Sequence, residues 1–408
     1  MAIGSAGDLF PMLRVALALR LRGHRISFLG PEQHRPYVEQ AGLPFHGVAV
    51  DEAVLDDPRL WHPRHGFGVV WRATRGAAAF LLNFVEALPA SEACVLLVHP
   101  LALPEADLCR AARPDIRIAA VYLAPSNLPT VHDPLVVGPV SVPRWVPLGA
   151  RRWLWRRVGT RMIDPVVLPG VNGERRQRGL PPVRHALRYL FQVPDLSLAL
   201  FPSWFAPSQP DWPTPLLQSD FPVYDPNPEA AFSAELAAFL ASGEAPIVFT
   251  PGTGNRQAAG YFRAALRAAA TLKRRAIFLT PHENQLPAAL PPSVLWQAYV
   301  PLRKLLPECA AIVHHGGIGT TAEALQSGVL QLVVPFAHDQ FDNAARVAVL
   351  GIGLRLPAAH LSAARLTRRL HRLLSSRIAA VNARAVATRF AAHPEMESIC
   401  QALVALPL

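Results

Sequence analysis

One stretch in the last third of the chain constrains the fold more than any other. It is residues 311–328, AIVHHGGIGTTAEALQSG. The unbroken apolar run from Ala310 to Val313 predicts a buried parallel strand. Glycines then turn the backbone, and the residues from Thr320 to Ser327 have helical periodicity, with Gly328 as the stop signal. The sequence therefore predicts a strand, a glycine turn and the start of a helix.

The glycine turn predicts an anion site. Its glycines let backbone amides approach a ligand closely, and the helix that follows directs unpaired N–H groups and its positive dipole end at the same point. Such a point binds phosphate well. His315 and Thr320 can add an imidazole and a hydroxyl, and Glu323 could reach a ribose one turn further on. A plain strand–helix turn with a buried histidine pair is the alternative that spacing alone leaves open.

A second buried strand follows, over residues 329–335, and it runs into a polar cluster at residues 338–343, HDQFDN. Open α/β sheets bind ligands at this edge of their strands. With this cluster, the sequence resembles the nucleotide-sugar-dependent glycosyltransferases of GT-B architecture, over nearly the whole chain. The resemblance implies an α/β fold with two Rossmann-like domains that face each other across a cleft.

The resemblance also implies how a donor would be bound. In that family the glycine turn holds the donor pyrophosphate, the glutamate after it holds the ribose, and an Asp-Gln pair holds the sugar hydroxyls. The matching positions here are His315, Gly317, Gly319, Thr320, Glu323, Asp339 and Gln340.

Three further donor positions are implied before the glycine turn. Thr253 follows the predicted strand 246–250, in a turn where the family usually has a serine near the diphosphate, and it preserves the hydroxyl. Tyr299 and Val300 stand where the family has a tryptophan stacked on the base, with backbone bonds to the edge of the base. A tyrosine can stack as well, although a core tyrosine is the simpler interpretation of the sequence.

The chain opens with a predicted βαβ unit. Met1–Ile3 is a short first strand, the turn GSAGDLFP follows, an amphipathic helix is expected from about Met12 to Arg22, and Ile26–Gly30 is the next strand. Strands normally have about five or six residues, so a natural start further upstream stays open. The turn lacks the full glycine fingerprint of a dinucleotide site.

Asp8 in this turn is the candidate catalytic base. From the residues alone, it is better explained as the N-cap of the first helix. In the family, however, this turn presents the base, which is a histidine in many members and an aspartate in the Gly-Ser-x-Gly-Asp branch. Inverting transfer needs such a base for the acceptor hydroxyl, together with stabilisation of the departing nucleotide diphosphate. His24, at the far end of the helix, is expected to be structural.

Composition narrows the function classes. With 51% hydrophobic and 17% charged residues, the chain is not disordered. The net charge of +11 invites a nucleic-acid interpretation, but the basic residues form no dense tract and no nucleic-acid module, so no nucleic acid is expected as a partner. An anionic donor or an anionic membrane surface would suit the surplus of arginines.

The absence of several motifs determines what we expect for metals, cofactors and cellular compartment. The four cysteines have no metal spacing or pairing pattern, which fits a reducing cytoplasm. Neither an Asp-x-Asp motif nor a His/Cys ligand cluster occurs, so we expect no metal and no cofactor besides the nucleotide-sugar donor. No signal peptide or spanning segment is found, which predicts a cytoplasmic protein, with peripheral contact to the inner membrane as an option.

The length of the chain predicts two or three domains of about 150 residues. We expect an N-terminal Rossmann-like acceptor-binding domain over 1–205, a proline-rich linker over 206–243 and a Rossmann-like donor-binding domain over 244–390. By resemblance, a C-terminal helix over 391–408 crosses back to the N-terminal domain.

Aromatic residues in the first half predict an amphiphilic acceptor. The segment 128–145 is apolar and broken by prolines, and Trp153 and Trp155 are flanked by arginines, which suits a bilayer interface or an amphiphilic ligand. A surface helix whose tryptophans pack on the core is an equal alternative. The candidate acceptor contacts are Phe10, Trp61, Phe67, Trp71 and Phe80.

Four motifs sharpen the resemblance: DPRLW at 57–61, FPSWFAP at 201–207, DWP at 211–213 and HDQFDN at 338–343. They are similar to the rhamnosyltransferases that build rhamnolipids from dTDP-L-rhamnose and a hydroxyacyl lipid acid, whereas HHGGIGTTAE is closer to the sterol and macrolide branches. The expected enzyme is an inverting hexosyltransferase that moves L-rhamnose to a hydroxyl of an amphiphilic lipid such as a 3-hydroxyalkanoyloxyalkanoate. A UDP-glucose-dependent glucosyltransferase for a sterol or macrolide-like acceptor, a catalytically silent lipid-binding partner and an epimerase of the same fold are the alternatives.

Overall fold

The computed structural model describes residues 1–48, 50, 52–62, 64–89, 91–133, 136–137, 140–227, 231–391 and 395–406. Its contacts divide the chain into two compact units. The first combines Met1–Val54, Pro63–Tyr224 and Pro394–Leu408, and the second combines Leu55–His62 with Asp225–His393. The short segment Leu55–His62 therefore belongs to the second unit, although the sequence placed it inside the N-terminal domain.

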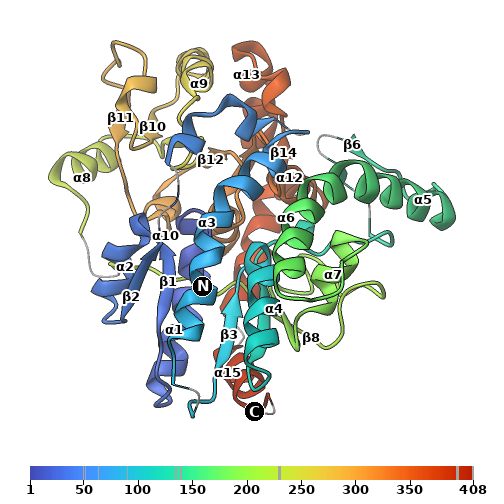
Figure 1. The fold of residues 1–408 in the computed structure, drawn as a ribbon. Helices are drawn as coiled ribbons and strands as arrows, with labels where there is room; N and C mark the ends of the chain where they lie inside the picture. The colour runs from blue at the N-terminus through green and yellow to red at the C-terminus, as the bar shows by residue number, and fades with distance from the viewer. Residues whose placement is uncertain are drawn as a thin grey trace. The chain divides into compact units, whose positions relative to one another are not determined.

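The first unit contains parallel strands, one short antiparallel pair (β5 and β6) and surrounding helices (Figure 1). Its strands are β1 (Phe28–Pro31), β2 (Phe45–Val48), β3 (Val95–Val98), β4 (Arg117–Tyr122), β5 (Val136–Val137), β6 (Val140–Ser141), β7 (Leu196–Leu200) and β8 (Leu216–Ser219). Its helices are α1 (Ala6–Leu21), α2 (Arg35–Gln40), α3 (Gly66–Glu86), α4 (Leu103–Ala112), α5 (Leu148–Val158), α6 (Asp164–Gln177), α7 (Ala186–Gln192) and α15 (Glu395–Val404). Part of the apolar segment 128–145, residues 134, 135, 138 and 139, lies outside the described residues.

Residues Met1–Ile3 occupy the position of a central strand in this unit. β1 pairs with β2, and β3, β4, β7 and β8 form a second parallel set. Ala2 N–H donates to Leu29 O of β1 at 3.0 Å, and His99 N–H, just after β3, donates to Met1 O at 3.2 Å. The buried opening segment thus joins the two sets in a Rossmann-like order, although it is not assigned as a strand.

The first helix begins earlier than the sequence predicted. α1 starts at Ala6 rather than near Met12, and it runs through Pro11. Proline inside a helix removes one hydrogen bond, which is why the sequence suggested a later start. Ser5 provides the N-cap, so the turn that carries Asp8 is already the first turn of the helix.

The second unit contains a six-stranded parallel sheet in the order β11-β10-β9-β12-β13-β14. Its strands are β9 (Ile247–Thr250), β10 (Ala276–Leu279), β11 (Val294–Gln297), β12 (Ala311–His314), β13 (Leu330–Val333) and β14 (Gly353–Arg355). Its helices are α8 (Ala234–Ala241), α9 (Ala259–Leu272), α10 (Leu302–Leu305), α11 (Ile318–Ser327), α12 (Gln340–Val349), α13 (Ala363–Leu374) and α14 (Arg377–Ala387).

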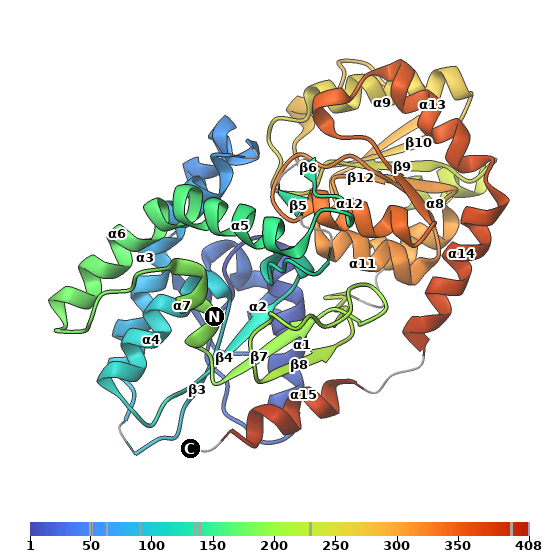
Figure 2. The same ribbon diagram turned by 90° about the vertical axis from the view of Figure 1, so that its right-hand side faces the viewer.

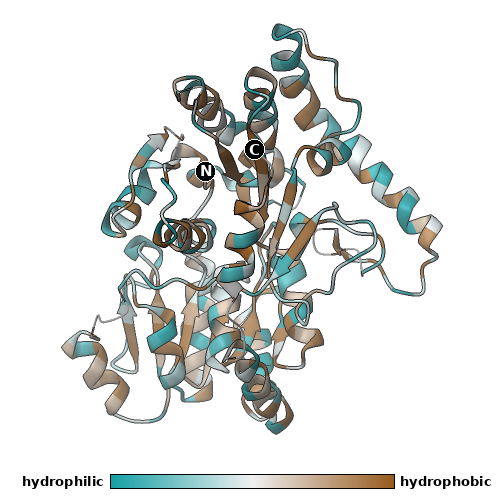
Figure 3. Cartoon of the chain, turned by 90° about the horizontal axis from the view of Figure 1, so that it is seen from below, coloured by the Kyte–Doolittle hydropathy of each residue, from teal (hydrophilic) through white to brown (hydrophobic). Residues whose placement is uncertain are grey.

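Helices cover both faces of this sheet. α9 and α13 lie on one face and α11 and α12 on the other (Figure 2). Every residue of β9, β10, β12 and β13 is buried, as expected for parallel strands covered on both sides. Apolar residues accordingly gather in the strands, while the helices combine apolar and polar residues (Figure 3). The strand predicted over 310–313 is present as β12, one residue later, and the helix predicted after the glycine turn is present as α11.

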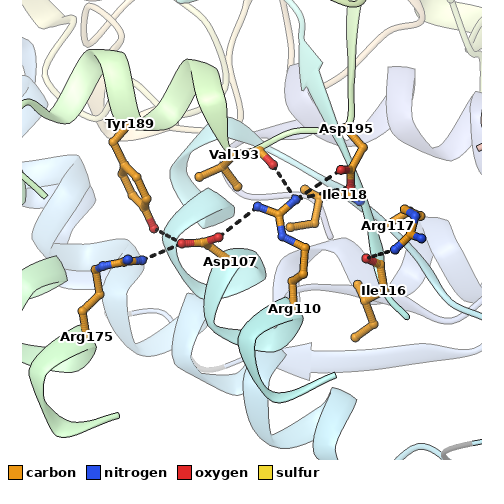
Figure 4. A network of polar contacts seen from close by, with 9 residues as sticks. All are labelled: Asp107, Arg110, Ile116, Arg117, Ile118, Arg175, Tyr189, Val193 and Asp195. Carbon is orange, nitrogen blue, oxygen red and sulfur yellow. Dashed lines mark hydrogen bonds and ion pairs between the residues drawn. The ribbon is translucent and has the colours of Figure 1, made fainter. Parts of the chain in front are cut away.

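A polar network joins three helices of the first unit (Figure 4). The Asp107 carboxylate on α4 accepts from Arg175 of α6 at 2.6 Å and from the Tyr189 hydroxyl of α7 at 2.9 Å. It also pairs with Arg110 at 3.0 Å, and Arg110 donates to Val193 O at 2.9 Å, just before β7. One carboxylate therefore links the helices between residues 164 and 192 to the sheet.

Candidate active site

Three loops of the second unit meet at one edge of its sheet. β12 lies between β9 and β13, and all three strands run parallel, so the loops after Thr250, His314 and Val333 emerge side by side. The strand order reverses between β9 and β12. Open α/β sheets bind ligands at such a reversal, outside the carboxyl ends of the strands.

Close contacts between two of these loops require glycine. Gly316 has φ +93°, and a Cβ there would lie 2.6 Å from Val333 Cγ1. A Cβ on Gly317 would lie 2.5 Å from His315 Nε2, and a Cβ on Gly252, after β9, would lie 2.8 Å from the same nitrogen. The His315 ring therefore sits between two glycine backbones, and side chains at either position would displace it.

The two neighbouring histidines have different roles. His314 is fully buried, and its Nδ1 accepts from Gly316 N–H at 3.2 Å. Its Nε2 must then carry the proton that it donates to Gln331 Oε1 at 3.1 Å. Burial lowers the pKa of His314 to about 3. This histidine is neutral and holds the turn in place. For His314, the structural role that we gave as the alternative for the histidine pair therefore applies.

His315 has a buried ring nitrogen without a partner. Its Nδ1 forms no hydrogen bond within the described part of the chain. Burial lowers the pKa of His315 to about 4, so the imidazole is neutral near pH 7. An unpaired buried polar atom costs about 1–3 kcal/mol, which a ligand could recover.

The helix after the turn offers further donors. α11 begins at Ile318 with Gly317 as its N-cap, and no side chain caps it. Its first N–H groups and the positive end of its dipole therefore remain available to an anion. Thr320 is the third residue of this helix and is half-buried. The predicted donor turn thus has the geometry of an anion site.

Asn343 connects the loop after β13 to the glycine turn. Its Nδ2 donates to Gly316 O at 2.9 Å and to Asp339 Oδ2 at 2.8 Å. Gln340 is buried, and its Oε1 accepts from the backbone N–H groups of Phe336 at 2.8 Å and Ala337 at 3.1 Å. The sequence assigned no role to Asn343, because only the fold shows that its amide spans two loops.

The remaining predicted donor residues lie around this edge. Glu323 is half-buried on α11, and burial, together with Asp225, raises its pKa to about 7 against the opposing effect of Arg303. Thr253 is exposed, and its carbonyl accepts from His282 Nε2 at 2.8 Å. Tyr299 is 53% exposed while Val300 is buried. The exposure of Tyr299 removes the alternative that it is a core residue.

In the first unit, Asp8 lies at the corresponding edge, after the central segment Met1–Ile3. It is the third residue of α1, and its Oδ2 accepts from Ser5 N–H at 2.8 Å and pairs with Ser5 Oγ at 3.3 Å. Asp8 therefore caps the helix from inside its first turn, whereas the sequence suggested it as the N-cap residue itself. Burial raises the pKa of Asp8 to about 6, although the hydrogen bonds from Ser5 oppose this shift.

Gly4 makes room for the Asp8 carboxylate. Its φ is +123°, and a Cβ there would lie 2.2 Å from Asp8 Oδ2. The Gly4 carbonyl accepts from His34 Nε2 at 3.0 Å and from Gln33 Nε2 at 3.1 Å. The turn is thus fixed from behind by Gln33 and His34, which lie in the short 3-10 turn between β1 and α2, and sequence spacing could not show this contact.

The candidate acceptor residues of the first unit differ in their surroundings. Phe10 packs against Tyr37 with ring centroids 5.3 Å apart, and Phe80 is half-buried on α3. Phe67 is 37% exposed, but Trp71 is only 2% exposed and packs among apolar residues of α6 and α7. We therefore remove Trp71 from the acceptor contacts, because a core side chain cannot cover a ligand.

Trp61 belongs to the second unit. Its ring packs against Phe336 and His338, with centroids 6.4 and 6.0 Å apart. It therefore lies beside the loop after β13.

Neither a metal cluster nor a spanning helix is found among the described residues. No group of three or more His, Cys, Asp or Glu side chains there could hold a metal ion. No helix in the same part of the chain is both long and apolar enough to cross a membrane.

Comparison with known proteins decides the family. Residues 1–92 match the family model described as glycosyltransferase family 28 N-terminal domain, and residues 265–406 match the erythromycin biosynthesis protein CIII-like C-terminal domain. O-mycaminosyltylonolide 6-deoxyallosyltransferase from Streptomyces fradiae is 30% identical to this chain, over 98% of the chain and 95% of the relative. The chain belongs to the GT-B glycosyltransferases.

Solved structures agree with this fold. The glycotransferase of kitacinnamycin aligns over 98% of this chain and 96% of its own, with a TM-score of 0.73 and 20% identity. The spinosyn rhamnosyltransferase SpnG, in complex with thymidine diphosphate, aligns over 99% of this glycosyltransferase and 100% of its own chain, with a TM-score of 0.66 and 23% identity. The predictions of a GT-B fold and of a nucleotide-sugar-dependent glycosyltransferase are confirmed.

Proposed function

We propose that this glycosyltransferase moves a deoxysugar, with inversion, from a thymidine-diphosphate sugar to a hydroxyl of an amphiphilic acceptor. The observation that carries the proposal is the His315 turn, where a buried imidazole nitrogen without a partner meets an uncapped helix N-terminus. The choice of thymidine as the nucleoside of the donor is supported by SpnG, which is complexed with thymidine diphosphate.

The donor side acts by stabilising the leaving group. As the bond to the anomeric carbon breaks, negative charge develops on the nucleotide diphosphate. The N–H groups at the start of α11, the Thr320 hydroxyl and the neutral His315 donate hydrogen bonds to it, while Gly317 and Gly319 allow close approach. Glu323 binds the ribose, Asp339 and Gln340 bind the sugar hydroxyls, and Thr253, Tyr299 and Val300 contact the diphosphate and the base.

Asp8 takes the proton from the acceptor hydroxyl. Its pKa of about 6 leaves it mainly ionised at pH 7 and makes it a stronger base than an ordinary aspartate. The proton passes to Asp8 Oδ while the acceptor oxygen attacks the anomeric carbon. Gly4 supports this role because no other residue would leave space for the carboxylate.

The acceptor is amphiphilic, with an apolar portion besides the hydroxyl that is glycosylated. Phe10, Phe67 and Phe80 of the first unit supply aromatic surface, and burying each methylene group contributes about 0.8 kcal/mol. The motifs at 57–61 and 211–213 favour a hydroxyacyl lipid acid as acceptor and L-rhamnose as sugar. A macrolide-like acceptor is the second candidate, favoured by the relative whose name includes O-mycaminosyltylonolide.

We also propose that α5 and its flanks contact an anionic membrane surface. Between residues 134 and 163 the chain has six arginines and no acidic residue. Trp145 is 82% exposed and Trp153 is 54% exposed, and the Arg157 guanidinium lies 4.9 Å from the Trp153 ring. Arg151 is buried and anchors the helix by donating to Val146 O at 2.8 Å. Exposed tryptophans among arginines fit a lipid interface.

A two-step experiment tests the function. First, thermal unfolding is measured with thymidine diphosphate, uridine diphosphate and their sugar conjugates, and the thymidine compounds should stabilise the protein most. Second, transfer from dTDP-L-rhamnose is measured with hydroxyacyl acids of increasing length, for which kcat/KM should rise with length. Activity should persist in EDTA. A preference for small polar alcohols, or activity lost in EDTA and restored by magnesium, would contradict the proposal.

A further inference from the structure

The segment Leu55–His62, called the strap here, is attached to the second unit at two points. At the first, Asp56 pairs with Arg256 at 3.0 Å and its carbonyl accepts from Gln257 Nε2 at 3.0 Å. Both partners lie in the loop after β9. At the second, the Trp61 ring packs against Phe336 and His338 in the loop after β13.

These two attachments determine the path of the strap. β12 lies between β9 and β13, so a segment fixed to the loops of both outer strands must cross the end of β12. The outer strands are two spacings, or about 10 Å, apart. Asp56 and Trp61 are five residues apart and can span at most about 18 Å, so the segment between them can cross β12 but has no length for a long detour. What lies at the end of β12 is the His315 turn.

The Trp61 side chain is prepared for a polar ligand. Its Nε1 is buried and has no hydrogen-bond partner among the described residues. Buried indole N–H groups normally find a partner, and leaving one unpaired is costly. The ring is held beside the loop that carries Asp339 and Gln340, and His338 in that loop adopts a left-handed φ of +55°. Such strain in a non-glycine residue is typical of ligand sites.

We propose that the strap covers the donor site and that Trp61 donates its indole N–H to the sugar of the bound nucleotide sugar. This inference rests on the proposed donor function and moves Trp61 from the acceptor contacts to the donor contacts. A segment from the first half of the sequence then helps to select the sugar. Its motif DPRLW was noticed in the sequence, but its place in the second unit was not predictable from its position in the chain.

Binding experiments separate the sugar contact from the nucleotide contacts. Calorimetry would give Kd values for thymidine diphosphate and for dTDP-L-rhamnose with wild type, Trp61→Phe and a control, Trp145→Phe, whose ring is exposed in the first unit. Phenylalanine keeps the packing but removes the N–H. We expect Trp61→Phe to raise Kd for dTDP-L-rhamnose roughly three- to tenfold, the range for one hydrogen bond, and to leave Kd for thymidine diphosphate within about twofold. The control should change neither.

A second measurement does not depend on Trp61 substitution. Hydrogen exchange of residues 55–62 should slow when dTDP-L-rhamnose binds, and Asp56→Asn, which releases a surface attachment, should reduce this protection without changing thermal unfolding. Equal effects of Trp61→Phe on both ligands, or unchanged exchange in the strap, would overturn the inference. If the wild-type protein binds neither ligand, the proposed donor is wrong, and the strap inference, which rests on it, is wrong as well.

Discussion

Asp8 shows how one residue combines a structural and a chemical property. Its carboxylate accepts from Ser5 N–H inside α1, and its pKa is raised to about 6 by burial. Asp8→Asn keeps an oxygen for Ser5 but cannot accept a proton. We expect turnover to fall by roughly two to four powers of ten while Kd for thymidine diphosphate stays unchanged.

The pH profile gives an independent check of Asp8. The base acts only when ionised, and its pKa is raised, so turnover of the wild type should fall as pH drops through about 6. This limb should be absent from the residual activity of Asp8→Asn. Turnover near the wild-type level in the variant would leave Asp8 with its capping role alone.

His315 should contribute to binding as well as to turnover. A hydrogen bond to a charged phosphate is worth about 1.5–3 kcal/mol, so His315→Ala should raise Kd for thymidine diphosphate roughly tenfold or more. His315→Gln, which keeps an N–H donor, should recover part of the loss. His360→Ala, an exposed histidine in the same unit, is the matched control and should bind normally. Unchanged affinity of His315→Ala would exclude the assigned contact.

These residues also show what sequence could and could not predict. The glycine turn and its helix were predictable because strand, turn and helix signals are local. The different roles of His314 and His315 were not predictable, because they depend on Gln331 in the neighbouring strand and on Gly252 in another loop. Asn343 was missed for the same reason, since its partner Gly316 is distant in sequence.

At the level of elements, the Asp107 network fixes helices whose packing the sequence did not reveal. Asp107 accepts from Arg175 at 2.6 Å and Tyr189 at 2.9 Å, and the Arg175 side chain is only 12% exposed. Asp107→Asn would leave this guanidinium without its charge partner, so we expect the free energy of unfolding to fall by about 1–3 kcal/mol. Urea unfolding followed by tryptophan fluorescence would measure the change.

A surface ion pair provides the control for that measurement. Glu39 pairs with Arg35 at 2.9 Å, and both side chains are well exposed. Because solvent screens such pairs, Glu39→Gln should change the free energy of unfolding by less than about 1 kcal/mol. An equally small effect of Asp107→Asn would mean that α6 and α7 are held by apolar packing alone.

For the whole molecule, alternating strand and helix signals predicted an α/β chain, the resemblance implied two Rossmann-like domains of GT-B architecture, and the GT-B fold is confirmed. It did not show that a strap from the first half packs with the second unit, because an eight-residue polar and aromatic segment carries no signal of its distant partner. The strand order of each sheet was equally hidden, yet that order is what brings the loops of the donor site together.

The distribution of charge over the molecule gives the last prediction. The net charge is +11, but within the part of the chain that the structure describes only α5 and its flanks combine exposed arginines with exposed tryptophans in the way a lipid interface requires. Replacing Arg152, Arg156 and Arg157 by glutamine should therefore weaken binding to vesicles of anionic phospholipid, and wild-type binding should fall as salt increases. The matched control replaces Arg368, Arg369 and Arg372 of α13, which are exposed but have no aromatic residue in their helix. This control removes the same number of positive charges, so it distinguishes an effect of the α5 surface from an effect of total charge. Vesicle binding is measured by co-sedimentation. Equal loss of binding in both variants would show that net charge alone attracts the protein to lipid.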